Sequence, residues 1–160
     1  MNEISIDLYV SHRQIHFRSG PYDESFNDWT KDEIQQGAIL GKSHVVFDPI
    51  ASGDFDAVVN VRLAKGFTPS SDVHRVLKFP FIVVGDLYLS SPMAEHELKL
   101  DIAPGVYTGY FEVCEDSEQE ELYFNIVLIP NNSILPETAE FFIDDRFGGA
   151  KGKLLASRSV

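Results

Sequence analysis

Carboxylates are the groups in this sequence whose number and spacing most favour a chemical role. Between Lys99 and Arg146 the chain has no lysine or arginine, whereas acidic residues recur through that interval. The densest stretch, EVCEDSEQEELYF, places six carboxylates within ten residues: Glu112, Glu115, Asp116, Glu118, Glu120 and Glu121. Such a run can attract basic groups on a partner, and it is equally typical of a solvated loop between two strands. The residues alone leave both interpretations open.

Two other sets of residues have the chemistry of metal ligands. His12 and His16 are four residues apart, a spacing that brings ligands together on a helix. Here they flank the end of an expected strand, where the same spacing separates them. A calcium site at one end of the fold would draw oxygen ligands from Asp54, Asp56, Asp144 and Asp145. These aspartates lack an organised loop signature, so we expect neither a metal nor a cofactor.

No pattern of catalytic residues stands out. The chain has no glycine-rich phosphate loop and no nucleophile elbow. Its single cysteine, Cys114, lies in a strand-like stretch that favours a core position over a nucleophile, and a single cysteine excludes an internal disulfide. Acidic residues are so abundant that no two are marked as an acid and a base. We therefore expect a protein without enzymatic activity.

The composition limits both the class of protein and the class of partner. The chain has 160 residues, 44% of them hydrophobic, which favours a single globular domain. The formal net charge of −12, from 25 acidic and 13 basic residues, argues against nucleic acid or anionic membranes as direct partners. No apolar run could span a bilayer, and MNEISIDLYV lacks the blocks of a secretory signal. The expected location is the cytoplasm.

Short stretches with alternating or β-branched residues, separated by turn residues, predict an all-β fold. In ISIDLYV, apolar residues alternate with polar ones, as in a strand with one buried face. Similar patterns predict strands at 4–10, 43–48, 55–64, 72–84, 86–91, 96–102, 106–113, 122–129 and 139–144. Strands and helices do not alternate, so the expected architecture is a two-sheet antiparallel β-sandwich.

Turn residues and composition assign two further features. APGVY has proline and glycine at the positions that a type II turn prefers, which predicts a hairpin of 96–102 with 106–113. The final segment, GGAKGKLLASRSV, begins with two glycines and ends in polar residues. We therefore expect a single domain over residues 1–147 and a mobile C-terminal tail over 148–160.

The stretch FNDWTKDEIQQGA predicts one short helix near residues 30–37. Its helix-start motif comprises Asp28, Trp29, Thr30, Glu33, Ile34 and Gly37. Thr30 and Glu33 have the spacing of a capping box, and Trp29 and Ile34 have that of a hydrophobic staple. The closing glycine suits the left-handed residue that ends a helix. A helix this short is unstable alone, so Trp29 is expected to anchor it on the sandwich.

Three blocks of the sequence resemble a known family. The DWT opening with its acidic first turn and closing glycine, the stretch LKFPFIVVGDLYLSS and the stretch LKLDIAPGVYTGYFEV together resemble the competence protein J family of DNA-entry nuclease inhibitors. The resemblance covers roughly residues 5 to 130, and its blocks define a fold and carry no catalytic signature. It implies a cytosolic inhibitor or immunity protein whose partner is a cognate DNA nuclease.

With this resemblance, the acidic residues acquire a specific interpretation. The six carboxylates from Glu112 to Glu121 are expected on an exposed connection, where they would compete with DNA for a basic cleft of the nuclease. Phe26 and Trp29 are candidate aromatic anchors for the same partner. The alternative is a ligand- or calcium-binding β-sandwich module without enzymatic activity.

Overall fold

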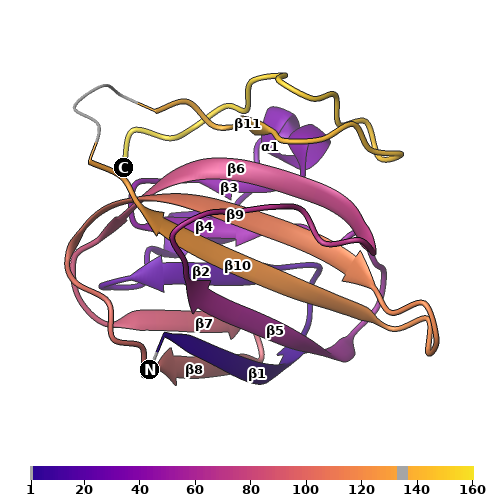
Figure 1. The fold of residues 1–160 in the computed structure, drawn as a ribbon, viewed down its shortest axis with the longest axis horizontal. Coiled ribbons are helices and arrows are strands. Elements are labelled where there is room, and N and C mark those ends of the chain that lie inside the picture. The colour runs from indigo at the N-terminus through magenta and orange to yellow at the C-terminus, as the bar shows by residue number, and fades with distance from the viewer. Residues whose placement is uncertain (1, 133–136) are drawn as a thin grey trace.

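The computed structural model describes residues 2–132 and 137–160, and it has the two-sheet β-sandwich expected from the sequence (Figure 1). Two short helices, η1 (Glu24–Asn27) and α1 (Lys31–Gln36), accompany the strands. The strands are β1 (Glu3–Val10), β2 (Ile15–Ser19), β3 (Ala38–Leu40), β4 (His44–Phe47), β5 (Phe55–Leu63), β6 (Val73–Val83), β7 (Leu87–Ser91), β8 (Ala94–Leu98), β9 (Gly105–Glu115), β10 (Leu122–Pro130) and β11 (Glu140–Phe141). Among these described residues, no helix is long and apolar enough to cross a membrane.

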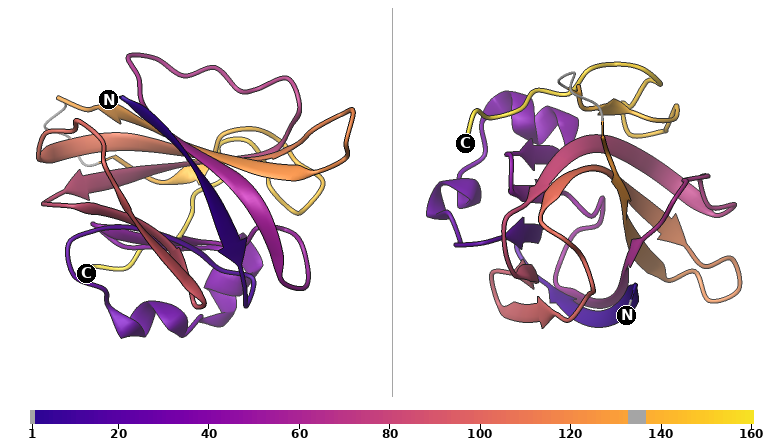
Figure 2. Two further views of the ribbon diagram at one scale, coloured as in Figure 1. Left: turned by 90° about the horizontal axis from the view of Figure 1, so that it is seen from below. Right: turned by 60° about the vertical axis from the view of Figure 1, so that its left-hand side comes forward.

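The strands form two layers, with η1 and α1 on the outer side of one of them (Figure 2). One sheet has the order β1-β5-β10-β9-β6-β11, and the other has the order β3-β4-β2-β7-β8. Neighbouring strands are antiparallel except for β5 and β10, which run in parallel with Val58 beside Tyr123. The predicted sandwich is confirmed, but one pair of strands departs from the antiparallel pattern.

Alternating side chains place apolar rows from both sheets between the two layers. On β4, Phe47 belongs to the central core, whereas its neighbour Val46 faces outward into a small cluster with Phe26. The Phe47 ring stacks on Phe111 of β9, with ring centroids 3.9 Å apart. Aromatic packing of this kind joins the two sheets at the centre of the molecule.

The connection from β5 to β6 crosses the outer face of its own sheet (Figure 1). β5 is parallel to β10, and the pairs β10–β9 and β9–β6 are antiparallel, so β5 and β6 run in the same direction. Same-direction strands in one sheet require a crossover. Residues 64–72 supply it: Phe67 stacks on Tyr110 of β9 at 4.1 Å, and Asp72 accepts a hydrogen bond from the Tyr123 hydroxyl of β10.

Strands β2 and β3 are absent from the sequence prediction. The turn between β1 and β2 has His12 and Arg13 with φ values of 56° and 55°, and Gln14 N–H donates to the Ser11 carbonyl at 3.1 Å. Such a two-residue turn needs positive φ at both central positions, where asparagine and glycine are usual. Because histidine and arginine occupy these positions, the sequence gives no turn signal there, and the start of β2 is not predicted.

The predicted hairpin of 96–102 with 106–113 is wrong. β8 pairs with β7 in the five-stranded sheet, whereas β9 pairs with β10 and β6 in the other sheet. The segment between β8 and β9 therefore passes from one sheet to the other. Leu100 and Ile102 pack against the core on the way, and the Tyr107 hydroxyl donates to the Ala103 carbonyl at 2.6 Å. The turn residues were compatible with a hairpin, but this apolar burial favours a connection between the layers.

The predicted capping of α1 is confirmed. Thr30 Oγ1 accepts a hydrogen bond from Glu33 N–H at 3.3 Å, and Glu33 Oε1 accepts one from Thr30 N–H at 2.9 Å. Gly37 ends the helix with φ of 81°. Trp29 is half-buried against the cluster of Phe26, Ile39 and Val46, which attaches the helix to the five-stranded sheet.

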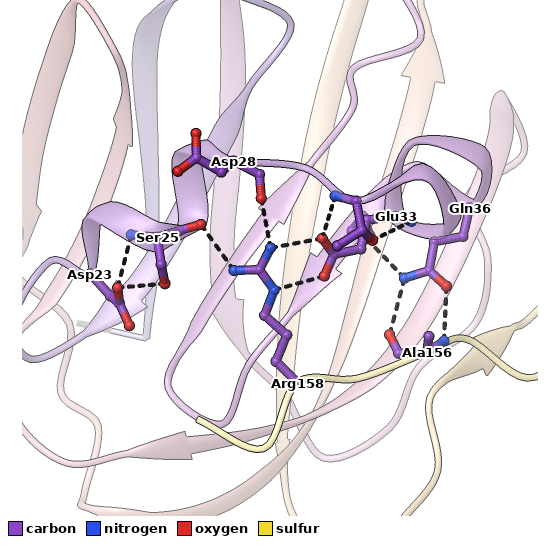
Figure 3. A network of polar contacts seen from close by, with 9 residues as sticks. Asp23, Ser25, Asp28, Glu33, Gln36, Ala156 and Arg158 are labelled. Atoms are coloured by element: carbon purple, nitrogen blue, oxygen red, sulfur yellow. Dashed lines mark hydrogen bonds and ion pairs between the residues drawn. The ribbon is translucent and has the colours of Figure 1, made fainter.

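The C-terminal segment is packed against the body, so the predicted mobile tail at 148–160 is wrong. Leu155 is buried in the central core. The Arg158 guanidinium donates to both carboxylate oxygens of Glu33 and to the carbonyls of Ser25 and Asp28, as Figure 3 shows. The glycines and polar residues of this segment are compatible with a mobile end. The four hydrogen bonds of Arg158 nevertheless attach the segment to η1 and α1.

Replacing Arg158 with alanine should lower the free energy of unfolding by about 2 kcal/mol, because Glu33 and two carbonyls lose their shared donor. Urea unfolding followed by circular dichroism measures the change. Arg146→Ala is the control, because that exposed arginine forms no such contacts. Equal stability of the two variants would show that the C-terminal contacts contribute little.

Two buried histidines lie on the outer face of the five-stranded sheet, beneath the segment that contains η1. His16 Nε2 faces the Gln14 side-chain oxygen at 2.8 Å, which places its proton on Nε2, and His44 Nε2 then donates to His16 Nδ1 at 2.9 Å. Phe26 stacks on the His44 ring at 4.3 Å. Burial lowers the pKa of His16 from 6.5 to about 3 and that of His44 from 6.5 to about 4, so both rings are neutral in the folded protein.

This pair predicts a loss of stability on mild acidification. Below about pH 6.5 the unfolded chain binds a proton at each histidine, whereas the folded chain does so only near pH 3 to 4. The free energy of unfolding should therefore fall by up to about 1.4 kcal/mol per pH unit for each histidine. Urea unfolding at several values between pH 7 and 4.5 measures this slope, which should decrease by about half in His44→Gln. His12→Asn, at the exposed hairpin turn, should leave it unchanged.

Candidate functional site

The acidic connection, residues 116–121, is a short ordered turn that joins β9 to β10. Asp116 Oδ1 accepts hydrogen bonds from Glu118 N–H at 2.8 Å and from Gln119 N–H at 3.0 Å. Asp116 N–H donates to the Glu121 carbonyl at 2.8 Å, which closes the end of the hairpin. An aspartate that binds the backbone two residues ahead stabilises a turn. The exposed charges therefore project from a defined backbone.

The structure separates the six predicted carboxylates into three kinds. Glu118, Glu120 and Glu121 are exposed. Asp116 uses its side chain within the turn, and Glu115, which ends β9, shares a hydrogen bond with His74 Nε2 at 2.9 Å. The first three are thus the carboxylates of the connection that remain available to a partner.

Glu112 is a correction to the expected exposed cluster. It lies within β9 and is completely buried. Its oxygens accept hydrogen bonds from Ser70 N–H at 2.8 Å, from the Ser70 hydroxyl at 2.9 Å and from Asn125 Nδ2 at 3.0 Å. The sequence places Glu112 in the acidic run, but the crossover covers it. Its role is to fasten residues 64–72 to the sheet.

Open hollows flank the acidic connection on both sides. One, of about 790 Å³, lies over β1, β5 and β10, and we call it the β5 hollow; it is lined in part by Asp7, Asp56, Val58, Asp116, Glu121 and Tyr123. The other, of about 670 Å³, lies beside the start of β6 and includes Asp72, His74, Glu115 and Glu120. The connection is therefore a ridge of negative charge between two concave surfaces.

The two predicted aromatic anchors differ in their accessibility. Phe26 is only 1% exposed and stacks on His44, so it cannot contact a partner without local opening, and this prediction is wrong. Trp29 is half-buried and lines a hollow of about 510 Å³ with Ile34, which is 64% exposed. A role for Trp29 in partner binding stays a prediction.

Three of the four aspartates considered for calcium form other contacts, and Asp56 is exposed on β5. Asp54 accepts a hydrogen bond from the Tyr9 hydroxyl at 3.2 Å, and Asp144 accepts one from Lys151 N–H at 2.9 Å. Asp145 has a completely buried side chain that forms an ion pair with Arg75 at 2.9 Å. Within the described residues, no group of three histidine, cysteine or acidic side chains is placed to hold a metal ion.

Cys114 is buried on β9 next to the acidic connection. Burial, together with the nearby charges of Glu112 and Asp72, raises the pKa of its thiol from 9.0 to about 12. The thiol is therefore protonated at neutral pH, which is the form that reacts least. This agrees with the expected structural role of the cysteine.

The sequence profile of competence protein J (ComJ) matches residues 7–133. The chain belongs to the competence protein J family. The match includes the helix-start motif, the crossover and the acidic connection, and it ends before β11 and the C-terminal segment. The family resemblance drawn from three short blocks of sequence is thus confirmed over most of the chain.

A solved structure shows the same fold. The chain is similar to the crystal structure of ComJ from Bacillus subtilis, described as an inhibitor of the DNA degrading activity of NucA, with 19% identity and a TM-score of 0.64. That match covers 80% of this chain and 96% of the other. A second structure, crocagin biosynthetic gene J, has 15% identity and a TM-score of 0.49 over 82% of this chain and 97% of the other. No significant match is found among curated proteins.

Replacing Glu112 with alanine should lower the free energy of unfolding by about 3 kcal/mol, because it leaves the buried donors of Ser70 and Asn125 without an acceptor. Glu118→Ala, on the exposed turn, should change it by less than about 0.5 kcal/mol. Chemical denaturation of both variants makes the comparison. A small effect at Glu112 would contradict its role as the anchor of the crossover.

Proposed function

We propose that this competence protein J chain binds a cognate DNA nuclease and inhibits it without being an enzyme. The observation that carries the proposal is the family match over residues 7–133. The related Bacillus subtilis protein, which has the same fold, is described as an inhibitor of the DNA degrading activity of NucA. The proposed partner of this chain is accordingly a nuclease protein, and the proposed place of action is the cytoplasm.

The proposed binding surface includes the acidic connection. A nuclease must attract polyanionic DNA, so the surface that contacts DNA is rich in basic groups. Glu118, Glu120 and Glu121 present carboxylates on a defined turn, where they can occupy positions otherwise taken by phosphates. The net charge of −12 adds long-range attraction to a basic partner. Competition with DNA for the same surface is the proposed mode of inhibition.

The absence of enzymatic activity is supported by what the reactive side chains do in the fold. Cys114 is buried with a raised pKa, and His16 is buried and neutral. Asp145 is held in a buried ion pair with Arg75. These groups have structural roles, and none of them forms a catalytic arrangement with a nearby hollow.

The first experiment identifies the product of the neighbouring gene and co-expresses the two proteins, followed by a pull-down and a DNA-degradation assay. We expect the two proteins to purify together and DNA to remain intact when the inhibitor is in slight excess. A neighbouring nuclease that neither binds the chain nor loses activity in its presence would count against the proposed function.

Neutralising the ridge tests the proposed surface. Glu118, Glu120 and Glu121 changed together to glutamine should weaken binding about tenfold, mainly through slower association, and reduce its dependence on salt. The matched control is Glu24→Gln, Asp28→Asn and Asp32→Asn, which removes three exposed charges beside the other sheet. Stopped-flow association rates at two salt concentrations are compared between the two triple variants. Equal rates for the two triple variants would remove the acidic connection from the binding surface.

A further inference from the structure

The β5 hollow has an apolar floor with charge on its walls. Strand register places Val58 of β5 directly between Asp7 of β1 and Tyr123 of β10. Val58 points away from the core, because its neighbours on β5 are buried between the sheets, and it is 39% exposed. Asp56, two residues earlier on β5, points to the same side. The outer face here offers one aliphatic and one aromatic surface beside two carboxylates.

Three of the carboxylates around this hollow have no partner among the described residues. In the part of the chain that the structure describes, the side chains of Asp7, Asp56 and Glu121 form no ion pair and accept no hydrogen bond. Most other carboxylates that lie near a base are paired: Asp48 with Arg13, Glu95 with Arg18, Glu137 with Lys78, Asp145 with Arg75 and Glu33 with Arg158. The negative charge of the β5 hollow is thus free to pair with an external cation.

The neighbouring hollow beside β6 differs in this respect. Asp72 accepts hydrogen bonds from the Tyr123 hydroxyl with both oxygens, at 2.7 and 2.6 Å, and Glu115 is paired with His74. These contacts satisfy Asp72 and Glu115, two of its carboxylates, and they also fix the Tyr123 ring as a wall of the β5 hollow. A cation from outside therefore gains more by entering the β5 hollow.

The spacing of the free carboxylates suits a large organic cation better than a metal ion. No group of three acidic, histidine or cysteine side chains within the described residues could hold a metal. A lysine or arginine side chain has an aliphatic stem that can lie on Val58 and against the Tyr123 ring. Its charged end can then reach carboxylates on either side, as guanidinium and ammonium groups do at protein interfaces.

We propose that the β5 hollow receives a single lysine or arginine side chain from the DNA-contacting surface of the nuclease. This inference rests on the proposed function and assigns the central contact of the interface to Asp7, Asp56 and Val58. The acidic connection then forms one wall of the site and guides the partner into it. A basic side chain seated here would be withdrawn from the DNA phosphates that it normally contacts.

Paired variants test the hollow in the full-length protein, with the nuclease identified by the co-expression experiment as the probe. Asp7→Asn with Asp56→Asn should raise the dissociation constant about 30-fold or more, because a buried intermolecular ion pair is lost. The control, Glu24→Gln with Asp32→Asn, removes the same number of charges beside the other sheet and should change it less than about threefold. Calorimetric titration gives both constants.

A second pair of variants separates blocking of the hollow from loss of charge. Val58→Lys places a cation of the inhibitor inside its own hollow and should abolish detectable binding. Val84→Lys, at a residue that is 59% exposed outside any strand, adds the same charge and should bind like the unmodified protein. Circular dichroism confirms that each variant is folded before titration.

The outcomes distinguish this inference from the proposed function. Tight binding by the unmodified protein, together with loss in the Asp7/Asp56 and Val58 variants alone, supports the β5 hollow. If the unmodified protein inhibits the nuclease and these variants bind as well as their controls, the hollow is not the contact site and the proposed function stands. If the unmodified protein neither binds nor inhibits the nuclease, both proposals fall.

Discussion

The fastening of residues 64–72 across the six-stranded sheet is the constraint on which the rest of the structure depends. β5 and β6 lie in one sheet in the same direction with β10 and β9 between them, so the chain must pass over the outer face. A connection over a sheet would leave polar backbone groups against the strands, and Glu112 accepts the Ser70 N–H at that point. Asn125 of β10 donates a hydrogen bond to Glu112, and its side-chain oxygen accepts one from Asn60 of β5. One polar network thus holds β5, β10, β9 and the crossover in register.

The same crossover divides the outer face of the sheet into a covered half and an open half. Over β9 and β6 the face is closed by Phe67, Ser70 and Asp72. Over β1 and β5 it stays open, and the β5 hollow lies there. The acidic connection stands at the boundary, so its exposed carboxylates border concave surfaces on both sides. The proposed binding surface thus lies on the six-stranded sheet, whereas the helix-start motif packs on the other sheet.

Local sequence patterns correctly predict the features that depend on residues close together in the chain, such as the caps of α1. Thr30, Glu33 and Gly37 form the predicted caps because each interaction involves residues fewer than five positions apart. Glu112 could not be separated from its acidic neighbours, since its burial depends on Ser70, which is 42 residues away in the chain. The β1–β2 turn was missed because His12 and Arg13 adopt a conformation that favours asparagine or glycine. The incorrect hairpin has a similar origin, because turn residues do not specify which sheet the next strand joins.

The C-terminal segment lies outside the family match, yet it stabilises β3 and α1, which lie within it. Arg158 N–H donates to the Leu40 carbonyl and Lys42 N–H donates to the Val160 carbonyl, so the segment covers the free edge of β3. The Arg158 side chain then neutralises Glu33, and this contact with Arg158 lowers the pKa of Glu33 despite the opposing effect of burial. Glu33 therefore belongs both to the capping box and to an ion pair with the far end of the chain. The helix-start motif and the C-terminal segment thus cover the outer side of the five-stranded sheet, whereas the proposed binding surface lies on the opposite, six-stranded sheet.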